Sequence, residues 1–137
     1  MMSQTEWGND LGLGEQEMDV EHELQVGLVR ALDGALGSGS REEAGRILEQ
    51  LLDYTRVHFS AEELMMRLHA YPGFQEHELE HSKLLDQLHE VRRAFHGGEV
   101  QPTKELVTAL RHWLAEHIQT FDRGLALYLR QPGGSAA

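Results

Sequence analysis

Cysteine is absent from this 137-residue sequence, which excludes disulfides, thiolate metal sites and a cysteine nucleophile. Positive charge is scarce: 12 Lys and Arg stand against 23 Asp and Glu, for a formal net charge of -11. Nucleic acid and anionic membrane surfaces both need clustered basic residues, so neither is an expected partner. No apolar run approaches the roughly 20 residues of a membrane span, and no signal peptide is recognisable. We therefore expect a single cytoplasmic domain.

The hydrophobic pattern is helical in four segments, and nowhere does it alternate with the period of two that indicates a strand. Helices are predicted from residue 18 to a stop at 37–39, from 40 to about 69, from about 74 to 96, and from 102 onward. Ser40 and Glu43 predict a capping box at the start of the second helix. The sequence thus predicts an all-α, antiparallel up-down-up-down four-helix bundle over residues 18–130. An N-terminal arm (residues 1–17) and a disordered tail (residues 131–137) would flank the bundle.

Side chains that can bind metal interrupt the apolar stripe of every predicted helix. They are His22 in the first helix, His58 and Glu62 in the second, His77 and His81 in the third, and His117 and Asp122 in the fourth. A buried imidazole or carboxylate without a partner costs several kcal/mol. One such residue can find a local hydrogen bond. Four helices that each bury a polar side chain in need of a partner indicate a shared metal centre.

The spacing of these residues favours more than one ion. The pairs in the second and third helices are four residues apart, so each pair lies on one helix face and can converge on one ion or on adjacent ions. His117 and Asp122 are five residues apart, about 140° around an ideal helix, which suits Asp122 as a bridge better than as a second ligand to one ion. An all-nitrogen and oxygen set of seven excludes iron–sulfur clusters and disfavours structural zinc. Two ions such as iron or manganese fit better.

The motifs around these residues resemble those of the hemerythrins, specifically the bacterial single-domain kind, over about residues 7–129. The matching segments are Asp19-Val20-Glu21-His22, His58-Phe59-Ser60-Ala61-Glu62-Glu63, Tyr71-Pro72, His77-Glu78-Leu79-Glu80-His81 and Trp113-Leu114-Ala115-Glu116-His117-Ile118 followed by Asp122. A single HxxxE or HxxxH is common, whereas all seven positions in this order are specific. One departure is Glu21, where many family members carry Gln; it changes the charge near the opening but not the ligand set.

The resemblance implies a di-iron centre with unequal ions. His77, His81 and His117 would hold one iron, while His22 and His58 would hold the other. Glu62, Asp122 and an oxo or hydroxo group would bridge the two. The second iron keeps one open position, where dioxygen would bind reversibly as hydroperoxide without a protein acid or base. An apolar pocket wall is expected from Phe59, Met66, Trp113, Leu114 and Ile118.

The leading hypothesis is therefore a non-enzymatic oxygen-binding protein for transport, storage or delivery, as a monomer or weak homo-oligomer. Two alternatives use the same ligands: a di-iron oxidase or reductase of peroxide or nitric oxide, and an oxygen or iron sensor that acts through a partner protein. Asp19 and Glu63 are expected at the surface or as carboxylates that orient a ligating imidazole. The remaining four histidines are expected on solvated helix faces or ends: His69, His89, His96 and His112.

Overall fold

A computed structural model describes residues 16–131, and every regular element among them is helical. The elements are α1 (Gln16–Ser38), α2 (Arg41–Leu68), α3 (Phe74–His96), α4 (Val100–His117), a π-helical turn (Ile118–Asp122) and α5 (Arg123–Arg130). The all-α class is thus confirmed. The predicted N-terminal arm and C-terminal tail lie almost wholly outside the described residues.

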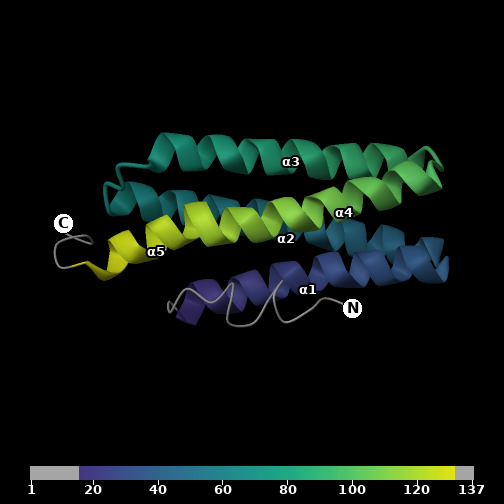
Figure 1. Cartoon of the computed structure of the whole chain (residues 1–137), viewed down its shortest axis with the longest axis horizontal. Helices are drawn as coiled ribbons and strands as arrows, with labels where there is room; N and C mark the ends of the chain where they lie inside the picture. Colours follow the sequence, from purple (N-terminus) through teal and green to yellow (C-terminus); the bar gives the residue numbers. More distant parts are fainter. Residues whose placement is uncertain (1–15, 132–137) are drawn as a thin grey trace.

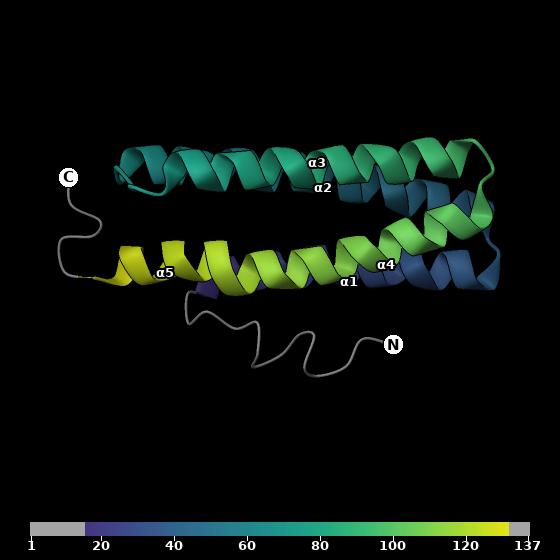
Figure 2. The same cartoon turned by 45° about the horizontal axis from the view of Figure 1, so that its top comes forward.

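The helices form a closed antiparallel bundle (Figure 1). α1 contacts both α2 and α4, and α3 contacts the same two helices. Short loops at residues 39–40, 69–73 and 97–99 join successive helices, while α4 and α5 follow one another along a single rod (Figure 2). The predicted up-down-up-down arrangement is confirmed. Of the described helices, none combines the length and the apolar character that crossing a membrane requires.

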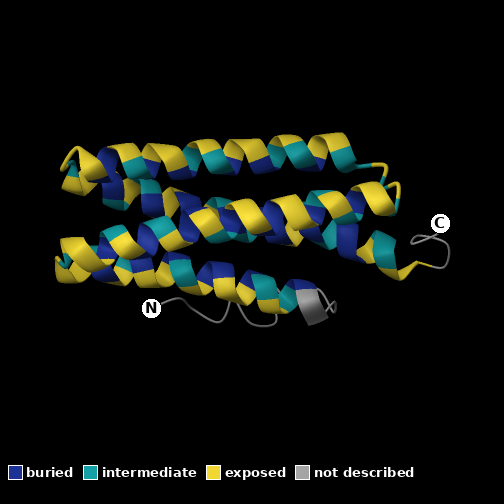
Figure 3. Cartoon of the chain, turned by 180° about the vertical axis from the view of Figure 1, so that it is seen from behind, coloured by how far each residue is buried: buried dark blue, intermediate teal, exposed yellow. Residues whose placement is uncertain are grey.

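Buried residues line the inner face of each helix, as Figure 3 shows. Toward the α1–α2 loop the core is apolar and contains leucines with at most 1% exposure, among them Leu32, Leu48, Leu51, Leu88 and Leu110. Complete burial of such a side chain contributes about 1.5–3 kcal/mol. Because this half fixes how the helices pack, it also fixes which polar side chains meet in the other half.

The start of α2 corrects one prediction. Ser40 is the N-cap residue of α2, but its hydroxyl makes no capping hydrogen bond. In a capping box, the backbone N–H of Ser40 would donate a hydrogen bond to the side chain of Glu43. It donates instead to the carbonyl oxygen of Ala35 at 3.2 Å. The helix boundary was predicted correctly, whereas the capping box was wrong because the turn after α1 already uses that N–H.

The fourth helical segment differs from prediction at two points. α4 begins at Val100 rather than at Pro102. Pro102 is accommodated because it lies in the first turn, where a backbone N–H has no partner within the helix. The segment was also expected to be one uninterrupted helix, yet the π-helical turn at Ile118–Asp122 separates α4 from α5. The last residue of this turn is Asp122, one of the seven predicted metal-binding residues.

Candidate metal centre

The seven predicted metal-binding residues come together in one buried cluster. α1, α2, α3, the end of α4 and the π-helical turn all contribute to it. None of the seven is more than 5% exposed: His22, His58, Glu62, His77, His81, His117 and Asp122. Buried ionisable groups are tolerated only when they are paired or bind a metal, so the contacts within this cluster determine what it can do.

Three histidines form one side of the cluster and share two carboxylate oxygens. Oε1 of Glu62 lies 2.9 Å from Nε2 of His77 and 2.9 Å from Nε2 of His81. Oδ1 of Asp122 lies 2.8 Å from Nε2 of His77 and 3.3 Å from Nε2 of His117. One oxygen of each carboxylate therefore faces this group of three imidazoles.

Two histidines on the opposite side meet the other two carboxylate oxygens. Oδ2 of Asp122 lies 2.9 Å from Nε2 of His22. Oε2 of Glu62 lies 3.5 Å from Nε2 of His58. Each carboxylate thus presents one oxygen to each histidine group, which is the arrangement of a ligand that bridges two ions.

The chemistry of the cluster fits a pair of cations. Nε2 of His22, His58 and His117 and Oε2 of Glu62 form no hydrogen bond to any residue that the structure describes. Yet each of these atoms lies 2.9–3.5 Å from an opposing atom of the cluster. Close approach without hydrogen-bonding geometry is expected of atoms that point at an ion between them. Imidazole nitrogens with carboxylate oxygens suit iron, manganese or zinc.

The π-helical turn explains how His117 and Asp122 reach the same cluster. In an α-helix, residues five apart point about 140° away from each other. A π-helix closes i to i+5 hydrogen bonds, so residues five apart become neighbours on one face. His117 ends α4 and Asp122 ends the turn, and their side chains approach to 3.3 Å. The awkward spacing in the sequence is therefore resolved by a local change of helix type.

Two more carboxylates contact the outer nitrogens of cluster histidines. Nδ1 of His81 donates to Oε2 of Glu63 at 2.8 Å, and Nδ1 of His58 donates to Oε1 of Glu21. Of the two outcomes predicted for Glu63, the structure shows the contact with an imidazole. The contact of Glu21 with His58 was missed, because it joins α1 to α2 and no spacing within one helix reveals it.

Electrostatics within the cluster favour charged forms of Glu62 and Asp122 and protonated forms of His22 and His77 when no metal is bound. Burial lowers the pKa of His77, but its hydrogen bonds with Asp122 and Glu62 outweigh burial and raise that pKa to about 9. Burial raises the pKa of Asp122, while nearby His117 and other cluster histidines lower it well below its usual value. The protonated imidazoles of His22 and His77 thus supply positive charge that metal ions would otherwise supply, and metal binding would release these protons.

Two of the five predicted pocket-wall residues contact cluster histidines, and the other three are buried. Phe59 stacks on His81 with ring centroids 3.8 Å apart, and Trp113 stacks on His117 at 5.0 Å. The other three are at most 3% exposed: Met66, Leu114 and Ile118. Their role in an oxygen pocket stays a prediction.

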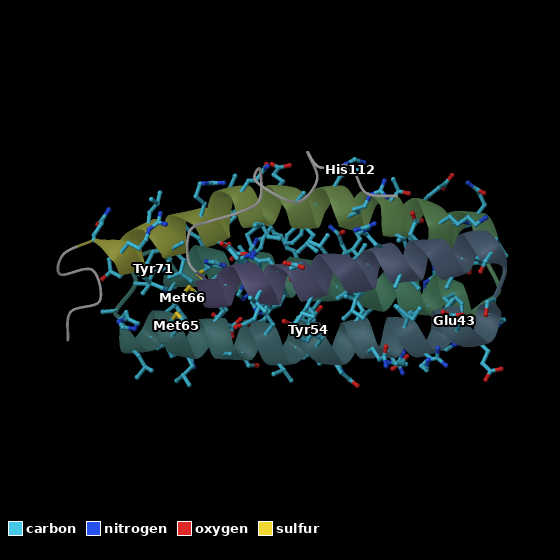
Figure 4. The ribbon with its side chains drawn as sticks, turned by 90° about the horizontal axis from the view of Figure 1, so that it is seen from below. Glu43, Tyr54, Met65, Met66, Tyr71 and His112 are labelled. Carbon is cyan, nitrogen blue, oxygen red and sulfur yellow. The ribbon has the colours of Figure 1, made fainter. Side chains whose placement is uncertain are left out.

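Three aromatic residues beside the cluster were not predicted. Tyr54 lies between α1 and α2 (Figure 4) and stacks on His58. Phe121 stacks on His117, and Tyr71 packs edge-on against His77. Tyr54 precedes His58 by four residues and Phe121 follows His117 by four. Helical spacing could therefore have identified these two.

The four remaining histidines lie outside the cluster, as predicted. His89 and His96 are exposed on α3, and His112 is exposed on the outer side of α4 (Figure 4). His69 is partly buried and follows the last residue of α2. Among the described residues, only the seven cluster members form groups that could hold a metal ion.

Comparisons with known proteins identify relatives of the whole described bundle. The family model for the hemerythrin HHE cation binding domain matches residues 13–128. A bacteriohemerythrin of Methylococcus capsulatus is 31% identical over 118 residues, covering 86% of this chain and 87% of the relative. A bacteriohemerythrin of Ralstonia nicotianae is 30% identical over 131 residues, covering 96% and 93%. A crystal structure of wild-type hemerythrin matches with a TM-score of 0.76 at 29% identity, covering 99% of this chain and 98% of that one.

Proposed function

Because the chain belongs to the hemerythrin HHE cation-binding family, we propose that it holds two iron ions and binds dioxygen reversibly, without enzymatic turnover. Its role would be oxygen transport, storage or delivery. The observation that carries this proposal is the orientation of Glu62 and Asp122, each of which presents one oxygen to the three-histidine side and one to the two-histidine side.

The proposed ligand assignment follows these two sides. The three-histidine ion would be held by His77, His81 and His117, and the two-histidine ion by His22 and His58, with both carboxylates shared. The two ferrous ions would supply one electron each to dioxygen and recover them on its release. Because the two-histidine ion has one protein ligand fewer, dioxygen is expected to bind there.

The surroundings of the cluster support reversible binding over turnover. Phe59, Leu114 and Ile118 are nearly or fully buried and apolar, so they would exclude water from the ions. A dry, apolar wall prevents loss of a reactive ligand by hydrolysis or proton leakage.

Optical titration of the iron-loaded protein would test this proposal. The ferrous protein should develop a ligand-to-iron charge-transfer band on exposure to dioxygen and lose it again under argon, with about two irons per chain. The zinc-loaded protein is the control, because zinc has no accessible redox change. Steady consumption of oxygen, peroxide or nitric oxide in the presence of a reductant would instead favour an enzyme. Fewer than two ions per chain would contradict the di-iron centre.

A further inference from the structure

We propose that Glu21 and Glu63 are positioning residues that tune the two metal ions separately, each through one ligating imidazole. This inference rests on the proposed function only in requiring two ions. Neither carboxylate belongs to the cluster of seven. Glu21 contacts Nδ1 of His58 and Glu63 contacts Nδ1 of His81, and in both rings Nδ1 is the nitrogen that faces away from the cluster centre.

Glu63 holds His81 from behind. Nδ1 of His81 donates to Glu63 at 2.8 Å, while Nε2 of the same ring lies 2.9 Å from Oε1 of Glu62. The contact fixes the tautomer that carries its proton on Nδ1 and leaves Nε2 as the atom available to a metal. Phe59, stacked flat on this ring with centroids 3.8 Å apart, fixes the plane in which Nε2 points.

Glu21 holds His58 in the same way, but from a different helix. Nδ1 of His58 donates to the Glu21 carboxylate across the α1–α2 interface. Tyr54 supports both partners, since its ring lies parallel to His58 and its hydroxyl donates to the backbone oxygen of Glu21 at 3.1 Å. The pair therefore depends on the packing of α1 against α2.

This carboxylate support is selective. Within the described part of the chain, Nδ1 of His22, His77 and His117 has no hydrogen-bond partner. His81 belongs to the three-histidine side and His58 to the two-histidine side, so one imidazole on each side has a carboxylate behind it. Such a carboxylate makes the imidazole a more basic ligand and stabilises the more highly charged metal.

The two contacts should differ in strength. The Glu21 side chain is 40% exposed, whereas that of Glu63 is 21% exposed. Because water weakens electrostatic interactions at exposed sites, the Glu63 carboxylate should influence its ion more strongly than Glu21 does.

The test compares Glu21→Gln and Glu63→Gln with Glu23→Gln in the iron-loaded, oxygen-free chain. Gln keeps an acceptor for the imidazole N–H but removes the charge. Glu23 is the matched control, because it is an exposed carboxylate on α1 outside the cluster. Both test variants should raise the midpoint potential, Glu63→Gln by more than Glu21→Gln. The control should match the wild type.

Alanine variants extend the test to metal affinity. Glu21→Ala and Glu63→Ala should each weaken Fe²⁺ binding by roughly 10- to 100-fold in chelator competition. Mössbauer spectra of the partly depleted proteins should show that different ions are lost: the two-histidine ion in Glu21→Ala and the three-histidine ion in Glu63→Ala. Circular dichroism checks that each variant is helical. If an Ala variant fails to fold, the midpoint potentials of the near-isosteric Gln variants test the proposal.

The outcomes separate this inference from the proposed function. Potentials equal to that of Glu23→Gln, or loss of the same ion from both Ala variants, would overturn the separate tuning. Since all measurements are made without oxygen, a wild-type protein that holds two irons but does not bind dioxygen reversibly overturns the proposed function alone. A wild-type chain that holds no iron overturns both.

Discussion

Replacement of Glu62 by Gln tests whether one side chain serves both metal ions. Its Oε1 atom lies 2.9 Å from Nε2 of both His77 and His81, and its Oε2 atom lies 3.5 Å from Nε2 of His58. Gln has nearly the same size as Glu, but it is neutral. Neither the three-histidine ion nor the two-histidine ion would then receive an anionic oxygen from this side chain. A charge-assisted contact contributes about 1.5–3 kcal/mol. Each ion should therefore bind about 10- to 150-fold more weakly, since every 1.4 kcal/mol is about tenfold.

The assay counts iron per chain after dialysis against a graded series of chelator concentrations. The wild type should retain two irons up to a higher chelator concentration, whereas Glu62→Gln should lose both in parallel. Glu43→Gln is the control, because it makes the same substitution in the same helix at an exposed position toward the other end of the bundle (Figure 4). Retention of two tightly bound irons in Glu62→Gln, or weakening of only one, would refute the bridging geometry.

Three further predictions address the cluster and the bundle. His22→Ala should leave about one iron per chain and abolish oxygen binding, as metal analysis and optical titration would show; two retained irons would contradict its assignment. Gly27→Ala should raise the free energy of unfolding by roughly 0.5–1 kcal/mol, because a Cβ at this mid-helix position meets nothing within 4 Å; urea unfolding that shows no gain would contradict this. The metal-free protein should lose stability as pH rises from 6.5 toward 9, because the pKa of His77 is raised from 6.5 to about 9 in the folded state. The stabilisation is complete below the unfolded pKa and lost as pH passes the folded pKa, so thermal unfolding that is constant over this range would refute it.

The fourth helical segment shows where prediction from helical periodicity ends. The sequence predicted that His117 and Asp122 belong to one site although five residues separate them, and the structure places both in the same buried cluster. It did not predict the π-helical turn between them, because α-helical periodicity assigns one angle to every residue. The turn is stable where the gain from bringing both side chains to the cluster exceeds the cost of local distortion, and that gain depends on the other three helices.

Local hydrogen bonds were also harder to predict than helix boundaries. Ser40 was correctly placed at the start of α2, since small polar residues are preferred there. Its predicted capping box fails because the N–H of Ser40 bonds to Ala35 in the preceding helix. The pattern of Ser and Glu is a local signal, and it cannot report competition from a neighbouring turn.

The sequence by itself determined the helical class and the inner face of each helix, because both follow from spacing along one helix. It also predicted the seven residues that the structure brings together, because they are metal-binding side chains on or near those inner faces. Only the tertiary structure decided which carboxylate oxygen faces which histidine, and that Glu21 on α1 supports His58 on α2. These contacts depend on how far each helix is shifted and rotated against its neighbours. Packing of the apolar half of the bundle sets those shifts, and no single helix contains that information.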